Sequence, residues 1–304
     1  MDYIIESRDL LKSYSRKKDA LSGVNIQVKP GEIFGFIGPN GAGKTTFVKT
    51  LLDFIRPTGG EILIMGEPPS RKIREKIGYL PERISIHPFL TPGEFLSFQA
   101  KLAGINRKLT KEKIDICLEK VKLTEVKNRQ IGTFSKGMMQ RAGIAQSIIA
   151  EPDILIYDEP NSGLDPVGIH DVRNIILGEK KRGATVFINS HQLLEVEKTC
   201  DRVAILNQGK VVAQGSKNEL SGQGALEIEL DNVTEEVITY FKSIDSNFTE
   251  SSGRFTLSPA NLSEEEKRLI PLTLVKMGAS IHYFSKRQES LEEIFQKALR
   301  GVQQ

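Results

Sequence analysis

The chain has 304 residues, of which 39% are hydrophobic and 27% are charged, and its formal net charge is +3. This length allows two domains, or one large domain with an appendage, and the composition is that of an ordinary soluble globular protein. The small net charge gives no argument for binding nucleic acid, and no apolar run approaches the ~18 residues needed to cross a bilayer, so any membrane role is expected to come through a partner chain.

A glycine-rich turn lies between a strand-like run at residues 32–37 and a helix-like run at 47–52. It reads Gly38, Pro39, Asn40, Gly41, Ala42, Gly43, Lys44, Thr45 and Thr46, which matches the phosphate-binding pattern G-x-x-x-x-G-K-[ST]. Glycines let the backbone N–H groups point at one anion, and the following helix adds its positive N-terminal end. Lys44 can reach the β- and γ-phosphates and Thr45 can ligate Mg²⁺. The sequence therefore predicts binding of a nucleoside triphosphate.

The first two-thirds of the chain alternates apolar runs with amphipathic stretches, which indicates an α/β fold. The expected strands are 24–28, 154–157, 184–188, 203–206 and, after a turn at 207–209, 210–214. From about residue 91 to 150 the pattern instead predicts successive helices, as in a helical subdomain inserted into the α/β core. Cys117 and Cys200 lack metal-ligand spacing and are expected to be buried thiols, with a disulfide as the alternative.

The composition changes again after residue 221. Strands are expected at 226–230 and 281–284, and Ser263 and Ser290 each begin a capping box. We therefore expect a phosphate-loop NTPase core over residues 1–220, a linker at 221–224 and a small accessory α+β domain over 225–304.

Two further segments lie between the expected core elements. Asp158 and Glu159 follow the apolar run 154–157, so they are expected at the carboxyl end of a buried strand, where α/β sheets hold ligands. Asp158 would hold Mg²⁺, and Glu159 would orient and polarise water for attack on the γ-phosphate. Ser135 and Gly137 stand at the start of a predicted helix, which offers either a second anion site or a plain N-cap.

These segments, followed by Asn161–Pro166 and then by Asn189, Ser190 and His191, resemble the nucleotide-binding subunit of ATP-binding cassette (ABC) transporters over roughly residues 3–220. The resemblance implies an ABC-type ATPase fold and the cofactors ATP and Mg²⁺. It also implies that Tyr14 stacks on adenine, that Glu159 is the catalytic base and that His191 senses the γ-phosphate. Ser135 and Gly137 would contact ATP held by the opposite subunit.

The chain departs from the family pattern at two positions. The family's signature motif corresponds to residues 134–138 of this chain, which include Ser135 and Gly137. Lys136 replaces a glycine of this motif, and it either helps to bind phosphate or faces solvent. Glu82 stands where the family usually has glutamine; it can still ligate Mg²⁺ or water, but it adds negative charge beside the triphosphate. Both variants, and the extra C-terminal domain, resemble the ABC-2 type exporter branch.

The resemblance implies an ATP-hydrolysing motor subunit that pairs with itself or with a second ABC ATPase subunit and drives export through an integral membrane permease. Such a subunit would be cytoplasmic and held at the inner face of the cell membrane by this partner. Ile86, Phe89 and Leu90 form either an apolar socket for the permease or part of the core. The alternative function is that of a soluble single-cassette ABC ATPase in assembly or repair.

Overall fold

The computed structural model describes residues 2–15, 18–221, 225–246, 248–251, 253–257, 263–287 and 289–300. Its contacts divide the chain into two units. One runs to Ser216 and includes the end of the last helix from Ala298, and the other is Lys217–Lys297. Apart from Ser221, the predicted linker at 221–224 lies outside the described residues.

A mixed sheet forms the centre of the first unit. In the described ranges it contains six strands in the order β5-β6-β7-β3-β8-β9, all parallel to their neighbours except β9. The strands are β3 (Ile33–Ile37), β5 (Ile77–Leu80), β6 (Ile154–Asp158), β7 (Thr185–Ser190), β8 (Arg202–Asn207) and β9 (Lys210–Ser216). The expected α/β fold with a parallel sheet is therefore confirmed.

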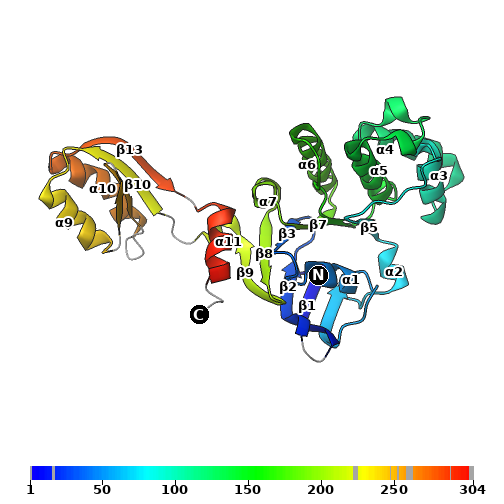
Figure 1. Ribbon diagram of the computed structural model, residues 1–304, viewed down its shortest axis with the longest axis horizontal. Helices are drawn as coiled ribbons and strands as arrows, with labels where there is room; N and C mark the ends of the chain where they lie inside the picture. Colours follow the sequence, from blue (N-terminus) through cyan, green and yellow to red (C-terminus); the bar gives the residue numbers. More distant parts are fainter. Residues whose placement is uncertain are drawn as a thin grey trace. The chain divides into compact units, whose positions relative to one another are not determined.

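Two hydrophobic clusters lie on opposite faces of this sheet, because successive side chains of a strand point to opposite sides. Leu155 of β6 belongs to the cluster that includes helices of the inserted subdomain. Ile156, the next residue, belongs to the cluster that includes Phe47 of helix α1. The helices of this unit are α1 (Lys44–Leu51), α2 (Arg71–Arg74), α3 (Pro92–Leu102), α4 (Arg107–Lys120), α5 (Lys136–Ile148), α6 (Pro166–Lys181) and α7 (Leu193–Thr199) (Figure 1).

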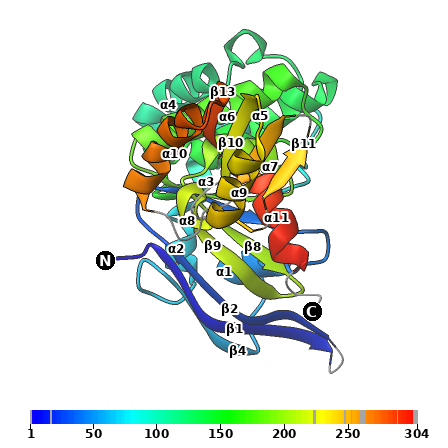
Figure 2. The same ribbon diagram turned by 90° about the vertical axis from the view of Figure 1, so that its left-hand side faces the viewer.

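Beneath α1 lies an antiparallel sheet that the sequence interpretation largely missed. Over the part of the chain described, it has three strands in the order β2-β1-β4: β1 (Ile5–Ser15), β2 (Lys18–Val28) and β4 (Gly59–Ile64) (Figure 2). Only the run 24–28 within β2 was predicted.

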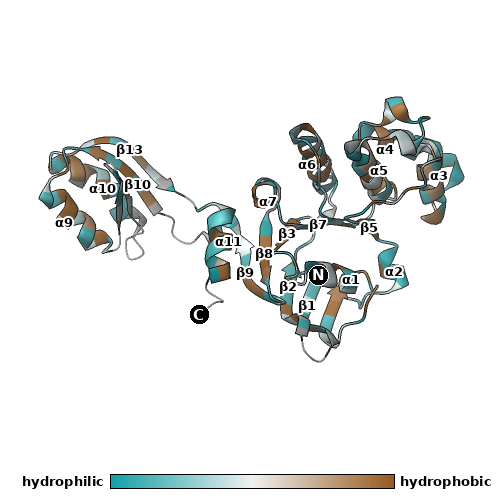
Figure 3. Ribbon diagram, viewed as in Figure 1, coloured by the Kyte–Doolittle hydropathy of each residue, from teal (hydrophilic) through white to brown (hydrophobic). Residues whose placement is uncertain are grey.

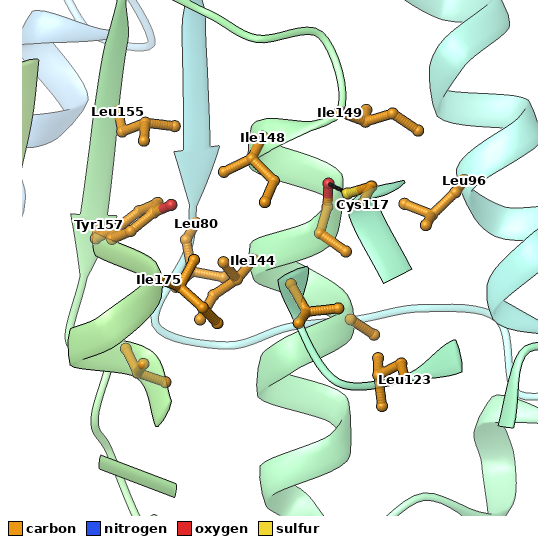
Figure 4. Packing of buried hydrophobic residues seen from close by; sticks show 14 of the residues in the cluster. Leu80, Leu96, Cys117, Leu123, Ile144, Ile148, Ile149, Leu155, Tyr157 and Ile175 are labelled. Atoms are coloured by element: carbon orange, nitrogen blue, oxygen red, sulfur yellow. Dashed lines mark hydrogen bonds between the residues drawn. The ribbon is translucent and has the colours of Figure 1, made fainter. Parts of the chain in front are cut away.

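The helical subdomain comprises α3, α4 and α5, which gather at the β5 edge of the sheet (Figure 1). Thr91 and Glu94 form the predicted capping box at the start of α3. Figure 4 shows the packed interior, in which the Cys117 thiol donates to the Ala145 carbonyl at 3.2 Å. Burial raises the pKa of Cys117 to about 12, so this free thiol is inert at neutral pH.

The second unit alternates strands and helices as βαββαβ. Its elements are α8 (Lys217–Leu220), β10 (Ala225–Asp231), α9 (Glu235–Ile244), β11 (Thr249–Ser251), β12 (Arg254–Leu257), α10 (Glu264–Lys276), β13 (Ser280–Arg287) and most of α11 (Leu291–Arg300). The antiparallel order of its described strands, β11-β12-β10-β13, is that of a ferredoxin-like sheet. Helix α9 carries both hydrophobic and hydrophilic residues (Figure 3), and Phe241 on α9 packs into the buried cluster with Phe255 on β12. The expected α+β character is confirmed, as are the capping boxes at Ser263 and Ser290.

None of the helices in the described ranges is both long and apolar enough to cross a membrane.

Helix α4 offers a test of the subdomain's packing. Leu118 is fully buried in the cluster, whereas Leu109 on the same helix is 48% exposed. Leu118→Ala should lower the free energy of unfolding by about 2–5 kcal/mol because it leaves a cavity, while Leu109→Ala should change it by less than about 1 kcal/mol. Urea unfolding followed by circular dichroism measures both, and equal effects would contradict the packing.

Candidate nucleotide-binding site

The carboxyl ends of the parallel strands meet at one edge of the central sheet. Strand register places Ile37 opposite Ser190 and Asp158 opposite Asn189. The segments that leave β3, β5, β6 and β7 therefore converge, as expected at the carboxyl edge of an α/β sheet. They surround a cavity of about 330 Å³ lined by Ala20, Asn40, Gly41, Gly43, Lys44, Thr45, Thr46, Glu82, Asp158, Glu159, Ser162, Asn189 and His191.

The glycine-rich turn forms one wall and lies tightly against neighbouring backbone. Gly43 has φ +111°, and a Cβ atom there would come 2.2 Å from the carbonyl oxygen of Ala20. A Cβ atom on Gly38 would come 2.3 Å from the carbonyl oxygen of Leu206. The Lys44 ammonium donates to the carbonyls of Gly38 at 2.7 Å and Pro39 at 3.3 Å, so it lies within the turn that precedes its own helix. Only glycine fits at positions 38 and 43 without displacing backbone.

Acidic and polar side chains form the opposite wall. The Glu159 carboxylate lies 2.7 Å from Nδ1 of His191 through Oε1, and its Oε2 accepts a hydrogen bond from the Ser190 hydroxyl at 3.3 Å. The Asn189 amide donates to Oδ1 of Asp158. Strands β6 and β7 thus hold both acids in fixed orientations.

The cavity carries more negative than positive charge. Of the ionisable side chains that line it within the described residues, Glu82, Asp158 and Glu159 are acids and Lys44 is the lysine, beside His191. Burial raises the pKa of Asp158 to about 6; the Asn189 hydrogen bond opposes this shift, and Glu82 and Glu159 add to it. Burial lowers the pKa of Lys44, against the attraction of the same three carboxylates.

This donor set fits a magnesium ion bound together with phosphates. Thr45, Glu82 and Asp158 supply the hard oxygen ligands that Mg²⁺ prefers, and Oδ1 of Asn189 is a buried acceptor without a hydrogen-bond partner among the described residues. Across the same residues, no cluster of three or more His, Cys, Asp and Glu side chains is arranged to hold a metal by itself. That agrees with the habit of Mg²⁺ to bind through one or two carboxylates plus substrate phosphates.

Several residues singled out from the sequence lie outside the cavity. Gly38, Pro39 and Ala42 shape the turn without lining the cavity, and Tyr14 is 62% exposed with the Lys12 ammonium 5.4 Å from its ring centroid. Ser135 and Gly137 do not line it either. The Ser135 hydroxyl accepts from the Met138 N–H at 3.3 Å, so it caps α5.

The two departures from the family pattern occupy different surroundings. Glu82 lines the cavity. Lys136 is exposed, and its side chain lies against Gly163. A Cβ atom added to Gly163 would come 1.9 Å from Nζ of Lys136. Of the suggested socket residues, Ile86 and Leu90 pack against the core, whereas Phe89 is 71% exposed.

Sequence reasoning did not propose three residues that line the cavity: Ala20, Ser162 and Asn189. Asn189 lies two residues before His191, and Ser162 lies three residues after Glu159. Both belong to segments that the sequence analysis singled out, so this nearness in the sequence was a usable signal. Ala20 reaches the cavity only because β2 crosses the phosphate-binding turn, and no local pattern indicates this.

The fit at Gly43 can be tested by one methyl group. Gly43→Ala should weaken ATP binding by about 100-fold or more, because Cβ would displace the turn from Ala20. Gly23→Ala is the matched control, since Gly23 also has positive φ (+75°) but a Cβ atom there would have no neighbouring atom within 4 Å. Isothermal titration with ATP measures both, and unchanged affinity in Gly43→Ala would contradict the geometry.

Comparison with known proteins agrees with this geometry. The family model described as ABC transporter matches residues 21–162. An ABC transporter ATP-binding protein of Nostoc sp. is 39% identical over 96% of this chain and 88% of its own length, and the bacitracin transport ATP-binding protein BcrA of Bacillus licheniformis is 36% identical over 99% of both. The solved structure of CbiO1 from Clostridium perfringens, described as part of the ABC transporter complex CbiONQ, has a TM-score of 0.66 at 30% identity, covering 71% of this chain and 89% of that one. The resemblance seen in the sequence, including its BcrA-like ABC-2 type branch, is confirmed, and the chain belongs to the ATP-binding proteins of ABC transporters.

Proposed function

We propose that this chain is the ATP-hydrolysing motor subunit of an ABC transporter. Two copies, or one copy and a second ABC ATPase subunit, would close over two ATP molecules and drive export through a separate membrane permease. The observation that carries the proposal is the cavity in which Lys44 and the phosphate-binding turn face Glu159 and His191. The end-to-end similarity to BcrA favours transport over the assembly or repair role that the sequence left open.

The phosphate-binding turn would hold the nucleotide. The N–H groups at the start of α1 and the Lys44 ammonium would bind the β- and γ-phosphates, with the ammonium leaving the carbonyls of Gly38 and Pro39. Thr45, Asp158 and Glu82 would hold Mg²⁺, which when bound offsets the charge of the phosphates and of the surrounding carboxylates. Tyr14 would stack on adenine from outside the cavity.

Glu159 would act as the general base. Its carboxylate would accept a proton from the water that attacks the γ-phosphate, which yields ADP and phosphate. His191 and Ser190 hold this carboxylate, and His191 would sense the γ-phosphate from the same position.

Ser135 and Gly137 support a composite site. They stand at the N-terminal end of α5, outside the cavity of their own chain. There they can offer free N–H groups to the nucleotide of a second copy. Because those contacts exist only in the closed pair, ATP binding would shift an open–closed equilibrium toward closure, and loss of the γ-phosphate would release it.

The permease would dock on the helical subdomain. A surface groove of about 520 Å³ runs between β5 and α3, and its lining includes Tyr79, Gln99 and Leu102. Phe98 and Leu102 of α3 are 54% and 67% exposed. These exposed apolar side chains of α3, together with Phe89, suit an apolar segment of a membrane partner, which would keep the subunit at the cytoplasmic face.

Glu159→Gln tests the function directly. The amide keeps the shape of the side chain but cannot accept the proton, so turnover should fall about 100-fold or more while ATP affinity stays within about threefold of wild type. With ATP and Mg²⁺ the variant should accumulate as a dimer, which light scattering after size-exclusion chromatography detects.

Lys44→Ala is the control, since it should bind ATP weakly and remain monomeric under the same conditions. A Glu159→Gln variant that hydrolyses ATP at the wild-type rate, or that stays monomeric with saturating ATP, would contradict the proposed function.

A further inference from the structure

Glu159 is held in an unfavourable backbone conformation. Its φ is +51°, in the left-handed region that non-glycine residues seldom occupy. The next residue is Pro160, and a residue before proline is normally pushed to extended conformations. Such a conformation is unfavourable and persists only where neighbouring contacts enforce it. The position of the Glu159 carboxylate therefore depends on the contacts that hold this turn.

Several contacts hold the turn, among them the hydrogen bond that the Ser190 hydroxyl donates to Oε2 of Glu159. On the sheet side, the Glu159 N–H donates to the Asn189 carbonyl at 2.8 Å, and the side chain meets His191. Within the turn, the Ser162 N–H donates to the Glu159 carbonyl at 3.1 Å. On the other side, the Gln140 side-chain amide donates to the Pro160 carbonyl at 2.7 Å.

Gln140 belongs to the helix that begins at the signature residues. It lies on α5, is only 5% exposed and bonds across 20 residues of sequence. Helix α5 makes a second contact with the same loop, because the side chain of Lys136 lies against Gly163. The first turns of α5 thus pack on the loop that follows Glu159.

We propose that Gln140 is a positioning residue for Glu159. By holding the Pro160 carbonyl it fixes the strained turn, and so sets where the Glu159 carboxylate stands in the cavity. This inference rests on the proposed function, in which Glu159 is the base. It also ties that base to the helix whose N-terminal end would meet the nucleotide of the second copy.

Gln140→Met tests the proposal, because methionine has a similar shape but no N–H donor. Hydrogen exchange of the nucleotide-free protein should show about tenfold faster exchange at the Ser162 amide, since the turn opens more often. ATP affinity should stay within about twofold, while kcat falls about tenfold with little change in KM. Gln140→Glu, which replaces the donor by an acceptor, should behave in the same way.

A double-mutant cycle separates positioning from general loosening. In the Glu159→Gln background, Gln140→Met should lower the residual rate by less than about twofold, because the residue it positions is already gone. The control is Gln130→Met, the same change at an exposed position outside α5, which should leave exchange and kcat unchanged.

Unchanged exchange at Ser162, or an equal loss of rate in both backgrounds, would overturn the proposal. Weakened ATP binding in both Gln140 variants would do the same. If the wild-type chain shows no ATP hydrolysis, the proposed function fails, but the exchange measurement still decides whether Gln140 holds the turn.

Discussion

The convergence of parallel strands at one sheet edge is the constraint on which the site depends. Because β3, β6 and β7 run in the same direction in adjacent positions, the residues that follow them meet around one cavity. Lys44 lies after the end of β3, Glu159 follows β6 and His191 follows β7. None of these residues is near another in the sequence, and the sheet alone brings them together.

The charges at this edge favour ligand binding over stability. Three carboxylates share a partly buried cavity with Lys44, and the pKa of Asp158 is raised to about 6 mainly by burial. Clustered acids of this kind destabilise a protein that binds nothing, since each disfavours the ionisation of the next. Their presence together with a strained Glu159 indicates a local cost to the fold, and a bound cation would offset the part of it that comes from the like charges.

The sequence predicted those parts of the fold whose signals are local. Continuous apolar runs gave the buried strands, and capping boxes gave the starts of α3 and α10. Strand β1 was missed because a bulge at Asp9, where φ is +45°, breaks its alternation between Ser7 and Leu10. The strand order of the ferredoxin-like sheet could not be predicted from the sequence either, because it depends on contacts between segments that are distant in the chain. At the site, motif residues were predicted as a group, but the contacts of Lys136 with Gly163 and of Gln140 with Pro160 follow from how α5 packs, which no local pattern encodes.

The central claim is that one copy supplies the cavity and another completes it. Mixing two defective variants tests this most directly: Lys44→Ala, which disables the phosphate-binding turn, and Ser135→Asp, which retains an N-cap residue but places a negative charge where a second copy's phosphate would lie. In a mixed pair, one cavity combines an intact turn with an intact signature. The account predicts ATP hydrolysis in the mixture that neither variant shows alone. A mixture as inactive as its components, or full activity of Ser135→Asp by itself, would contradict it.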